Sequence, residues 1–177
     1  MAREDRGAGR GARGSESCAK PLRGSGREAR GLNVLPSLRI AFNWQRHPGG
    51  NATGPLRRFA TDALRRLGVD AAEVGVLVCD DVAIRSLNRH YRGKDAATDV
   101  LSFEGGFTQP DGPAYLGDVA ISLETARRQA EEAGVPLLRE LEVLLLHALV
   151  HLMGHDHEND EGEMAALEAE LRRELLR

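Results

Sequence analysis

The chain has 177 residues, of which 41% are hydrophobic and 29% charged, so it is long enough for one folded domain with a core and too short for two full domains. Aromatic side chains make up only 4% of it, so the composition gives no sign of a stacking platform for nucleic-acid bases. The net charge of -3 combines a basic stretch at residues 1–36, with eight Lys/Arg against four Asp/Glu, and an acidic remainder, with sixteen against twenty-three.

The first 36 residues are predicted to form a disordered basic N-terminal arm. Gly, Arg and Ser dominate this stretch, which cannot bury enough apolar surface to offset the entropy lost on ordering. An alternative is that residues 1–36 are translated from an early start codon and are absent from the native protein. We expect the folded domain, interpreted below as a metal-dependent hydrolase, at residues 37–177.

The cellular location follows from what these patterns exclude. No run reaches the ~18 apolar residues needed to span a bilayer, so no membrane association is expected. The N-terminus lacks the apolar core of a secretory signal. The two cysteines form no CxxC pair or disulfide framework, which favours a reducing compartment. The expected location is the cytoplasm.

Nine secondary-structure elements are predicted from periodicity and from turn and cap residues. In chain order they are a strand at 38–44, a helix at about 55–67 capped by Thr53, a strand at 74–79, a helix capped by Asp80 or Asp81, a polar turn at 91–95 leading to a strand at 98–103, a strand at 116–122, and helices at 123–133, about 136–153 and about 160–176. This order predicts an α+β single domain, a mixed sheet of about four strands packed with about five helices.

Histidines are concentrated in the segment 147–157, which has the pattern HxxxHxxGxxH. His147 and His151 are four residues apart, so on a helix they lie on one face and can bind the same ion. Gly154 suits the left-handed conformation that ends a helix, after which His157 can approach that ion from another direction. Three imidazoles leave a fourth position for water, as catalytic zinc sites require, so one Zn²⁺ ion is predicted on the helix and the following loop.

Two neighbouring positions refine this prediction. Zinc proteases with this ligand spacing carry Glu directly after the first histidine as general base, whereas this chain has Ala148 there. The metal can still activate water, so the pattern favours hydrolysis but disfavours ordinary proteolysis. His155 is interpreted as a residue that does not bind the metal and that lies either close to the metal site or in a solvated loop. A role for His155 as an alternate metal ligand is left open.

The sequence resembles the YbeY family of bacterial endoribonucleases. The family motif H-G-x-x-H-L-x-G-Y-D-H corresponds to residues 147–157, with Ala148 where Gly is usual and His155 in place of the aromatic residue. Two further blocks agree with the family, residues 87–103 and residues 116–122.

The resemblance implies a zinc-dependent, single-strand-specific endoribonuclease that acts in 16S rRNA 3′-end maturation and ribosome quality control. It places the metal ligands at His147, His151 and His157 and a functionally important, catalytic arginine at Arg92. A guanidinium suits phosphate oxygens and stays charged at any working pH. The expected partners are single-stranded RNA or ribosomal RNA and, as a further option, small ribosomal subunit proteins. No organic cofactor is expected.

Two other functions remain open on the sequence. The first is a zinc metalloprotease-like hydrolase, which the ligand spacing favours and Ala148 disfavours. The second is a non-catalytic ribosome-associated zinc protein, in which a fourth protein ligand would complete a structural site. For the nuclease, the nucleophile is either water or the RNA 2′-hydroxyl, and the oligomeric state is left open.

Overall fold

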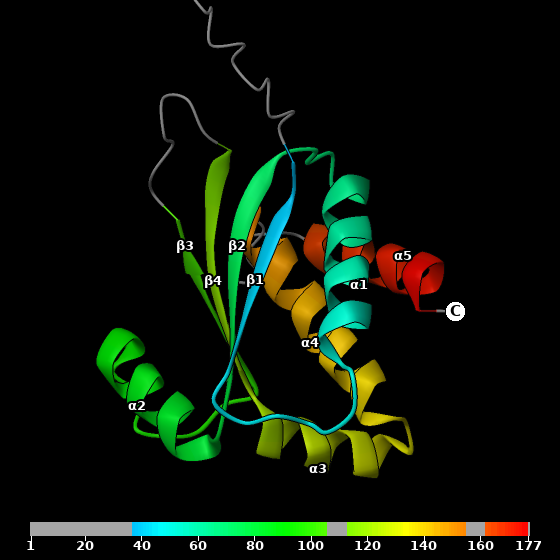
Figure 1. The fold of residues 1–177 in the computed structure, drawn as a ribbon. Coiled ribbons are helices and arrows are strands. Elements are labelled where there is room, and N and C mark those ends of the chain that lie inside the picture. The colour runs from blue at the N-terminus through cyan, green and yellow to red at the C-terminus, as the bar shows by residue number, and fades with distance from the viewer. Residues whose placement is uncertain (1–36, 106–112, 155–161, 177) are drawn as a thin grey trace, which may run out of the picture. The chain divides into compact units, whose positions relative to one another are not determined.

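The fold combines one four-stranded sheet with five helices (Figure 1). A computed structural model describes residues 37–105, 113–154 and 162–176. Its elements, in chain order, are β1 (Arg39–Trp44), α1 (Thr53–Arg66), β2 (Ala72–Cys79), α2 (Asp81–Arg92), β3 (Val100–Glu104), β4 (Ala114–Ser122), α3 (Leu123–Ala133), α4 (Leu137–Leu152) and α5 (Glu163–Leu175). The predicted order of elements and the α+β class are thus confirmed. The predicted disordered arm at 1–36 lies outside the described residues.

The sheet has the strand order β1-β2-β4-β3. Strands β1, β2 and β4 run parallel to one another, whereas β3 pairs antiparallel with β4 at the edge. The parallel pairs are joined through helices, because a parallel connection must cross over. The mixed sheet predicted from the sequence is therefore confirmed.

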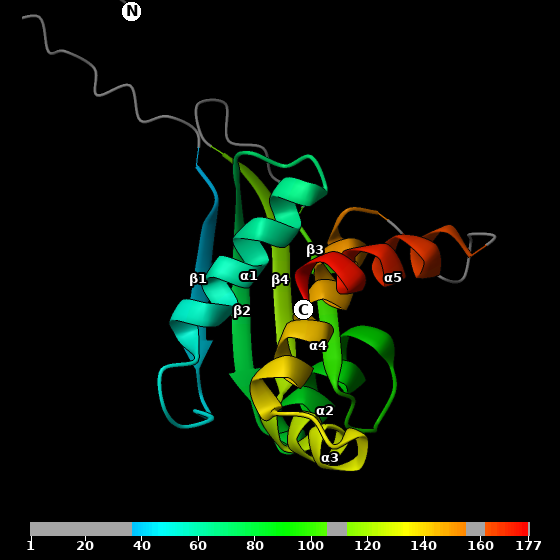
Figure 2. The ribbon, with the colours of Figure 1, turned by 90° about the vertical axis from the view of Figure 1, so that its right-hand side faces the viewer.

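The two faces of the sheet are covered differently, as side chains alternate between faces along each strand. On β4, Val119 and Ile121 belong to the main apolar core, which also holds the buried leucines of α4 and the apolar face of α1. Ala120 points to the other face, where a smaller cluster contains Ile84 of α2 and Leu101 of β3. Helices α2 and α4 therefore lie on opposite faces, and Figure 2 shows α5 packed outside α4 and α1.

A polar contact fixes the start of α2 against the start of α3. The Asp81 carboxylate accepts hydrogen bonds from the hydroxyls of Ser122 and Thr125, the latter at 2.7 Å, and from Arg128 at 2.9 Å. Burial acts to raise the pKa of Asp81, but these three donors outweigh it and hold the pKa below its ordinary value. The contact therefore stabilises the ionised form of Asp81.

Two local predictions were wrong. Thr53 does not cap α1: it is the first helical residue, the N-cap position is Ala52, and no side chain caps this end. The segment predicted as a polar turn at 91–95 begins inside α2, which continues to Arg92 and ends only where Gly93 adopts a left-handed φ of 69°. Of the two predicted candidates for the cap of α2, Asp80 or Asp81, it is Asp80 that caps the helix, by accepting from the Ala83 amide at 2.8 Å.

No helix within the described ranges is both long and apolar enough to cross a bilayer.

Candidate metal centre

Helix α4 presents two imidazoles one turn apart at its C-terminal half. Their ring centroids, those of His147 and His151, are 4.6 Å apart, with an angle of 81° between the ring planes. Both rings are half-buried, while the neighbouring residues Leu146, Ala148 and Val150 are buried. The predicted i, i+4 pair therefore lies on one helix face, with rings close enough to bind one ion.

Glu168 of α5 contacts the first of these rings. Its Oε2 atom lies 3.1 Å from Nδ1 of His147. Its other oxygen, Oε1, accepts from Nη2 of Arg172 at 2.5 Å. A carboxylate at Nδ1 favours the tautomer that carries its proton there and leaves the lone pair on Nε2, the arrangement common around metal-binding histidines. The donor set thus fits a divalent metal that accepts imidazole ligands.

The charge on Glu168 is maintained despite its burial. The residue is only 6% exposed, and burial alone would raise its pKa. The hydrogen bond from His147 and the positive charge of Arg172 act in the opposite direction and keep the pKa of Glu168 below its ordinary value. A carboxylate whose ionised form is favoured therefore orients the ring of His147.

Glu168 is not among the site residues predicted from the sequence, although the sequence contains a signal for it. Helix α5 buries Met164 and Leu171, which are four residues before and three residues after Glu168. Glu168 is thus an acidic residue within the apolar stripe of an amphipathic helix, where an unpaired charge is costly. What the sequence did not provide was its partner, because His147 is 21 positions away on another helix.

The third predicted ligand, His157, and the neighbouring His155 both lie outside the described residues. Helix α4 ends at Leu152, and Gly154 has a φ of 84°, the left-handed conformation that we predicted for it. The left-handed residue that we predicted after the end of this helix is therefore present at Gly154. Whether His157 binds the same ion stays a prediction.

Arg92 is the last residue of α2, and its side chain is exposed. Within the described part of the chain, no hydrogen bond or ion pair holds its guanidinium, and none links it to the histidine pair. Its helix lies on the sheet face opposite α4, so the structure does not bring Arg92 together with the histidines as a contact pair. The guanidinium is available to a ligand from solvent.

The chain is similar to known proteins over most of its length. The family model of Endoribonuclease YbeY matches residues 53–176. Endoribonuclease YbeY of Bradyrhizobium diazoefficiens is 41% identical over 149 residues, covering 79% of this chain and 80% of that protein. Endoribonuclease YbeY of Solibacter usitatus is 45% identical over 135 residues, covering 76% and 87%.

The solution structure of TM1509 from Thermotoga maritima has a similar fold. Its TM-score is 0.55 at 23% sequence identity, and the match covers 78% of this chain and 88% of that one. At this identity the likeness supports the fold, whereas the family assignment follows from the sequence matches. The chain belongs to the Endoribonuclease YbeY family.

Proposed function

We propose that this protein is a zinc-dependent endoribonuclease that cleaves single-stranded RNA, with His147, His151 and His157 as ligands of one Zn²⁺ ion and Arg92 as a phosphate-binding catalytic residue. The observation that carries the proposal is the pair of converging imidazoles on α4, one of them oriented by the buried carboxylate of Glu168. Membership of a family of endoribonucleases supports the choice of RNA as substrate.

Each residue has a defined task in this proposal. When bound, zinc supplies Lewis acidity toward the phosphate oxygens and lowers the pKa of water. Glu168 keeps the Nδ1 proton of His147 in place, so that Nε2 remains the ligand atom. Arg92 offers a planar fork of donors to the phosphate, on which negative charge builds up during phosphodiester cleavage.

A peptidase reaction finds less support at this centre. The residue after His147 is Ala148, which is 1% exposed and has no group that accepts a proton. Peptide hydrolysis with this ligand pattern uses a glutamate there as general base. Nothing in the described structure favours the metalloprotease or a purely structural zinc protein over the nuclease.

The cellular substrate and partners follow from the family and from charge. We propose that the protein acts in the cytoplasm on ribosomal RNA, at the 3′ end of 16S rRNA, and in ribosome quality control, with small ribosomal subunit proteins as candidate partners. Because residues 37–177 carry an excess of acidic side chains, affinity for RNA requires local basic groups such as Arg92 or a contribution from the basic residues 1–36.

The test incubates the full chain, loaded with Zn²⁺, with single-stranded RNA, double-stranded RNA and casein. We expect cleavage of single-stranded RNA, little cleavage of the duplex, no casein hydrolysis, and loss of activity with a chelator. Cleavage of casein, or RNA cleavage that persists at full rate in a metal-free sample, would contradict the proposal. A 2′,3′-cyclic phosphate on the product identifies the 2′-hydroxyl as nucleophile, whereas its absence points to water.

A further inference from the structure

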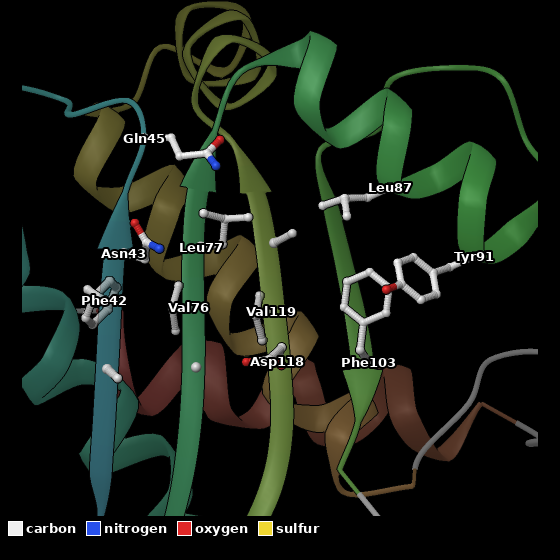
Figure 3. A pocket seen from close by; sticks show the side chains of 13 residues that line it. Phe42, Asn43, Gln45, Val76, Leu77, Leu87, Tyr91, Phe103, Asp118 and Val119 are labelled. Atoms are coloured by element: carbon white, nitrogen blue, oxygen red, sulfur yellow. The ribbon is translucent and has the colours of Figure 1, made fainter.

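A cavity of about 520 Å³ lies on the sheet face opposite the histidine pair. Figure 3 shows Asn43 and Gln45 on one side of it, Leu77 of β2 in the middle, and Tyr91 of α2 with Phe103 of β3 on the other side. Its volume falls within the range of ordinary small-molecule sites, which combine apolar walls with a few polar groups. Its lining, within the described residues, includes neither histidine of the pair nor Glu168.

The aromatic side of the cavity consists of two rings from different elements. The centroids of Tyr91 and Phe103 are 4.9 Å apart, and their planes meet at 64°, an edge-to-face arrangement that fixes their mutual orientation. Tyr91 is nevertheless 62% exposed, unusually open for a large hydrophobic residue. An exposed ring held by a neighbour offers a surface on which a flat aromatic ligand can stack.

The charged group among the described lining residues is the carboxylate of Asp118, which lies against Gly75 of the neighbouring strand. A Cβ atom at Gly75 would come within 2.1 Å of the Asp118 Oδ1 atom, so the glycine creates the space that this carboxylate occupies. The pKa of the Tyr115 hydroxyl is raised to about 12, by burial and then by its hydrogen bond to Asp118. Asp118 is itself exposed and lines the cavity, so its carboxylate is open to a ligand there.

We propose that this cavity binds an unpaired base of the RNA substrate, stacked on Tyr91 and hydrogen-bonded by Asp118, with guanine as the preferred base. A carboxylate repels phosphate but accepts N–H donors, and the Watson–Crick edge of guanine offers two neighbouring donors where the other bases offer fewer. The inference rests on the proposed endoribonuclease function and adds a base-binding site that is separate from the metal centre.

The surroundings of the cavity favour a nucleotide over a protein segment. Tyr91 belongs to the last turn of α2, which also carries Arg89, His90 and Arg92, so the aromatic side lies on a basic helix end. Positive side chains beside a stacking ring suit the phosphates that flank a bound base. The remaining polar lining, Asn43 and Gln45, offers both donors and acceptors to a base edge or ribose.

The experiment titrates the zinc-loaded full chain with guanosine and uridine, which contain no phosphodiester bond, while NMR follows the amide signals of Leu77 and Phe103. We expect saturable shifts, with guanosine binding at least about fivefold more tightly than uridine. Tyr91→Ala should lower the affinity for both nucleosides by about fivefold or more. Asp118→Asn should remove the preference for guanosine, and Asp62→Asn, a carboxylate exchange on α1, is the matched control.

Gly75→Ala provides a second test, because its new methyl group displaces the Asp118 carboxylate while leaving that residue in place. Gly75→Ala should lose the preference for guanosine, as Asp118→Asn does. Thermal unfolding of each variant shows whether it is still folded. No saturable shift with either nucleoside, or a preference that survives in both variants, would overturn the inference. Shifts of the same signals with protein concentration alone would also overturn it, since they would assign the cavity to a second copy of the chain.

Failure of this inference is distinguishable from failure of the proposed function. If the cavity binds no nucleoside while the zinc-loaded protein still cleaves single-stranded RNA, the base site is wrong and the nuclease stands. If nucleosides bind but RNA is never cleaved, the proposed reaction is wrong instead.

Discussion

Glu168→Gln removes the negative charge from the carboxyl group that contacts Nδ1 of His147 while leaving the size of the side chain nearly unchanged. The wild-type group is 3.1 Å from that nitrogen and is ionised, since its pKa lies below the ordinary value. A glutamine amide presents either a weaker acceptor or a donor to the same atom. The variant therefore tests whether this carboxylate orients His147 as a metal ligand.

The expected loss can be worked from this contact. Removing a carboxylate that supports a metal-binding histidine typically weakens metal affinity about 10- to 100-fold, or about 1.4–2.8 kcal/mol. The stabilisation that bound metal gives the folded chain falls by the same amount when metal is in excess. For a domain of this size, the zinc-induced rise in Tm should shrink by roughly 3–11 °C.

The assay measures zinc affinity by competition with a chromophoric chelator and Tm by calorimetry, with and without zinc. Glu170→Gln is the matched control, because Glu170 is an exposed glutamate on the same helix. Unchanged zinc affinity in Glu168→Gln, or an equal loss in Glu170→Gln, would refute the role assigned to Glu168. A lower Tm in zinc-free protein with unchanged zinc affinity would assign Glu168 to stability alone.

Three further changes separate reaction, folding and acid stability. Arg92→Ala should keep zinc stoichiometry but lower the rate of RNA cleavage at least about 100-fold, with partial recovery in Arg92→Lys; full activity in both variants would contradict the role of Arg92. Ala148→Gly should lower the free energy of unfolding, measured by chemical denaturation, by about 1 kcal/mol without changing zinc stoichiometry, because glycine is less favourable than alanine within a helix. A variant more stable than the wild type would contradict this expectation. Asp81→Asn should lower the free energy of unfolding by about 1–2 kcal/mol at pH 7. Because the pKa of Asp81 is lowered in the folded state, the difference in unfolding free energy between wild type and variant should shrink as pH falls below about 4. A difference that stays constant with pH would contradict the stabilising role of the ionised Asp81.

The secondary structure was predictable where a local pattern determines it. The alternating residues of β1 and the capped start of α2 at Asp80 needed no tertiary information. The wrong cap at Thr53 shows the limit of such rules: a residue that often caps a helix is also accepted within its first turn. The turn predicted at 91–95 starts two residues too early, because Tyr91 and Arg92 still belong to the preceding helix, which ends at Gly93.

The candidate site was predictable only in its local part. His147 and His151 share one helix turn, so their spacing alone indicates convergence. The contact of Glu168 with His147 depends on how α5 packs against α4, which no short pattern contains. The low aromatic content likewise argued against a stacking surface, yet Tyr91 and Phe103 come together because α2 packs beside β3.

The zinc content of single histidine variants tests the metal centre most directly. The chain is purified after zinc loading, and bound metal is measured per chain by elemental analysis in the wild type and in His147→Ala, His151→Ala and His157→Ala. We predict one zinc per wild-type chain and less than about a tenth of that in each variant, because a site that loses one of three imidazole ligands binds zinc far more weakly. Full zinc occupancy in any of these variants, or none in the wild type, would contradict the assignment.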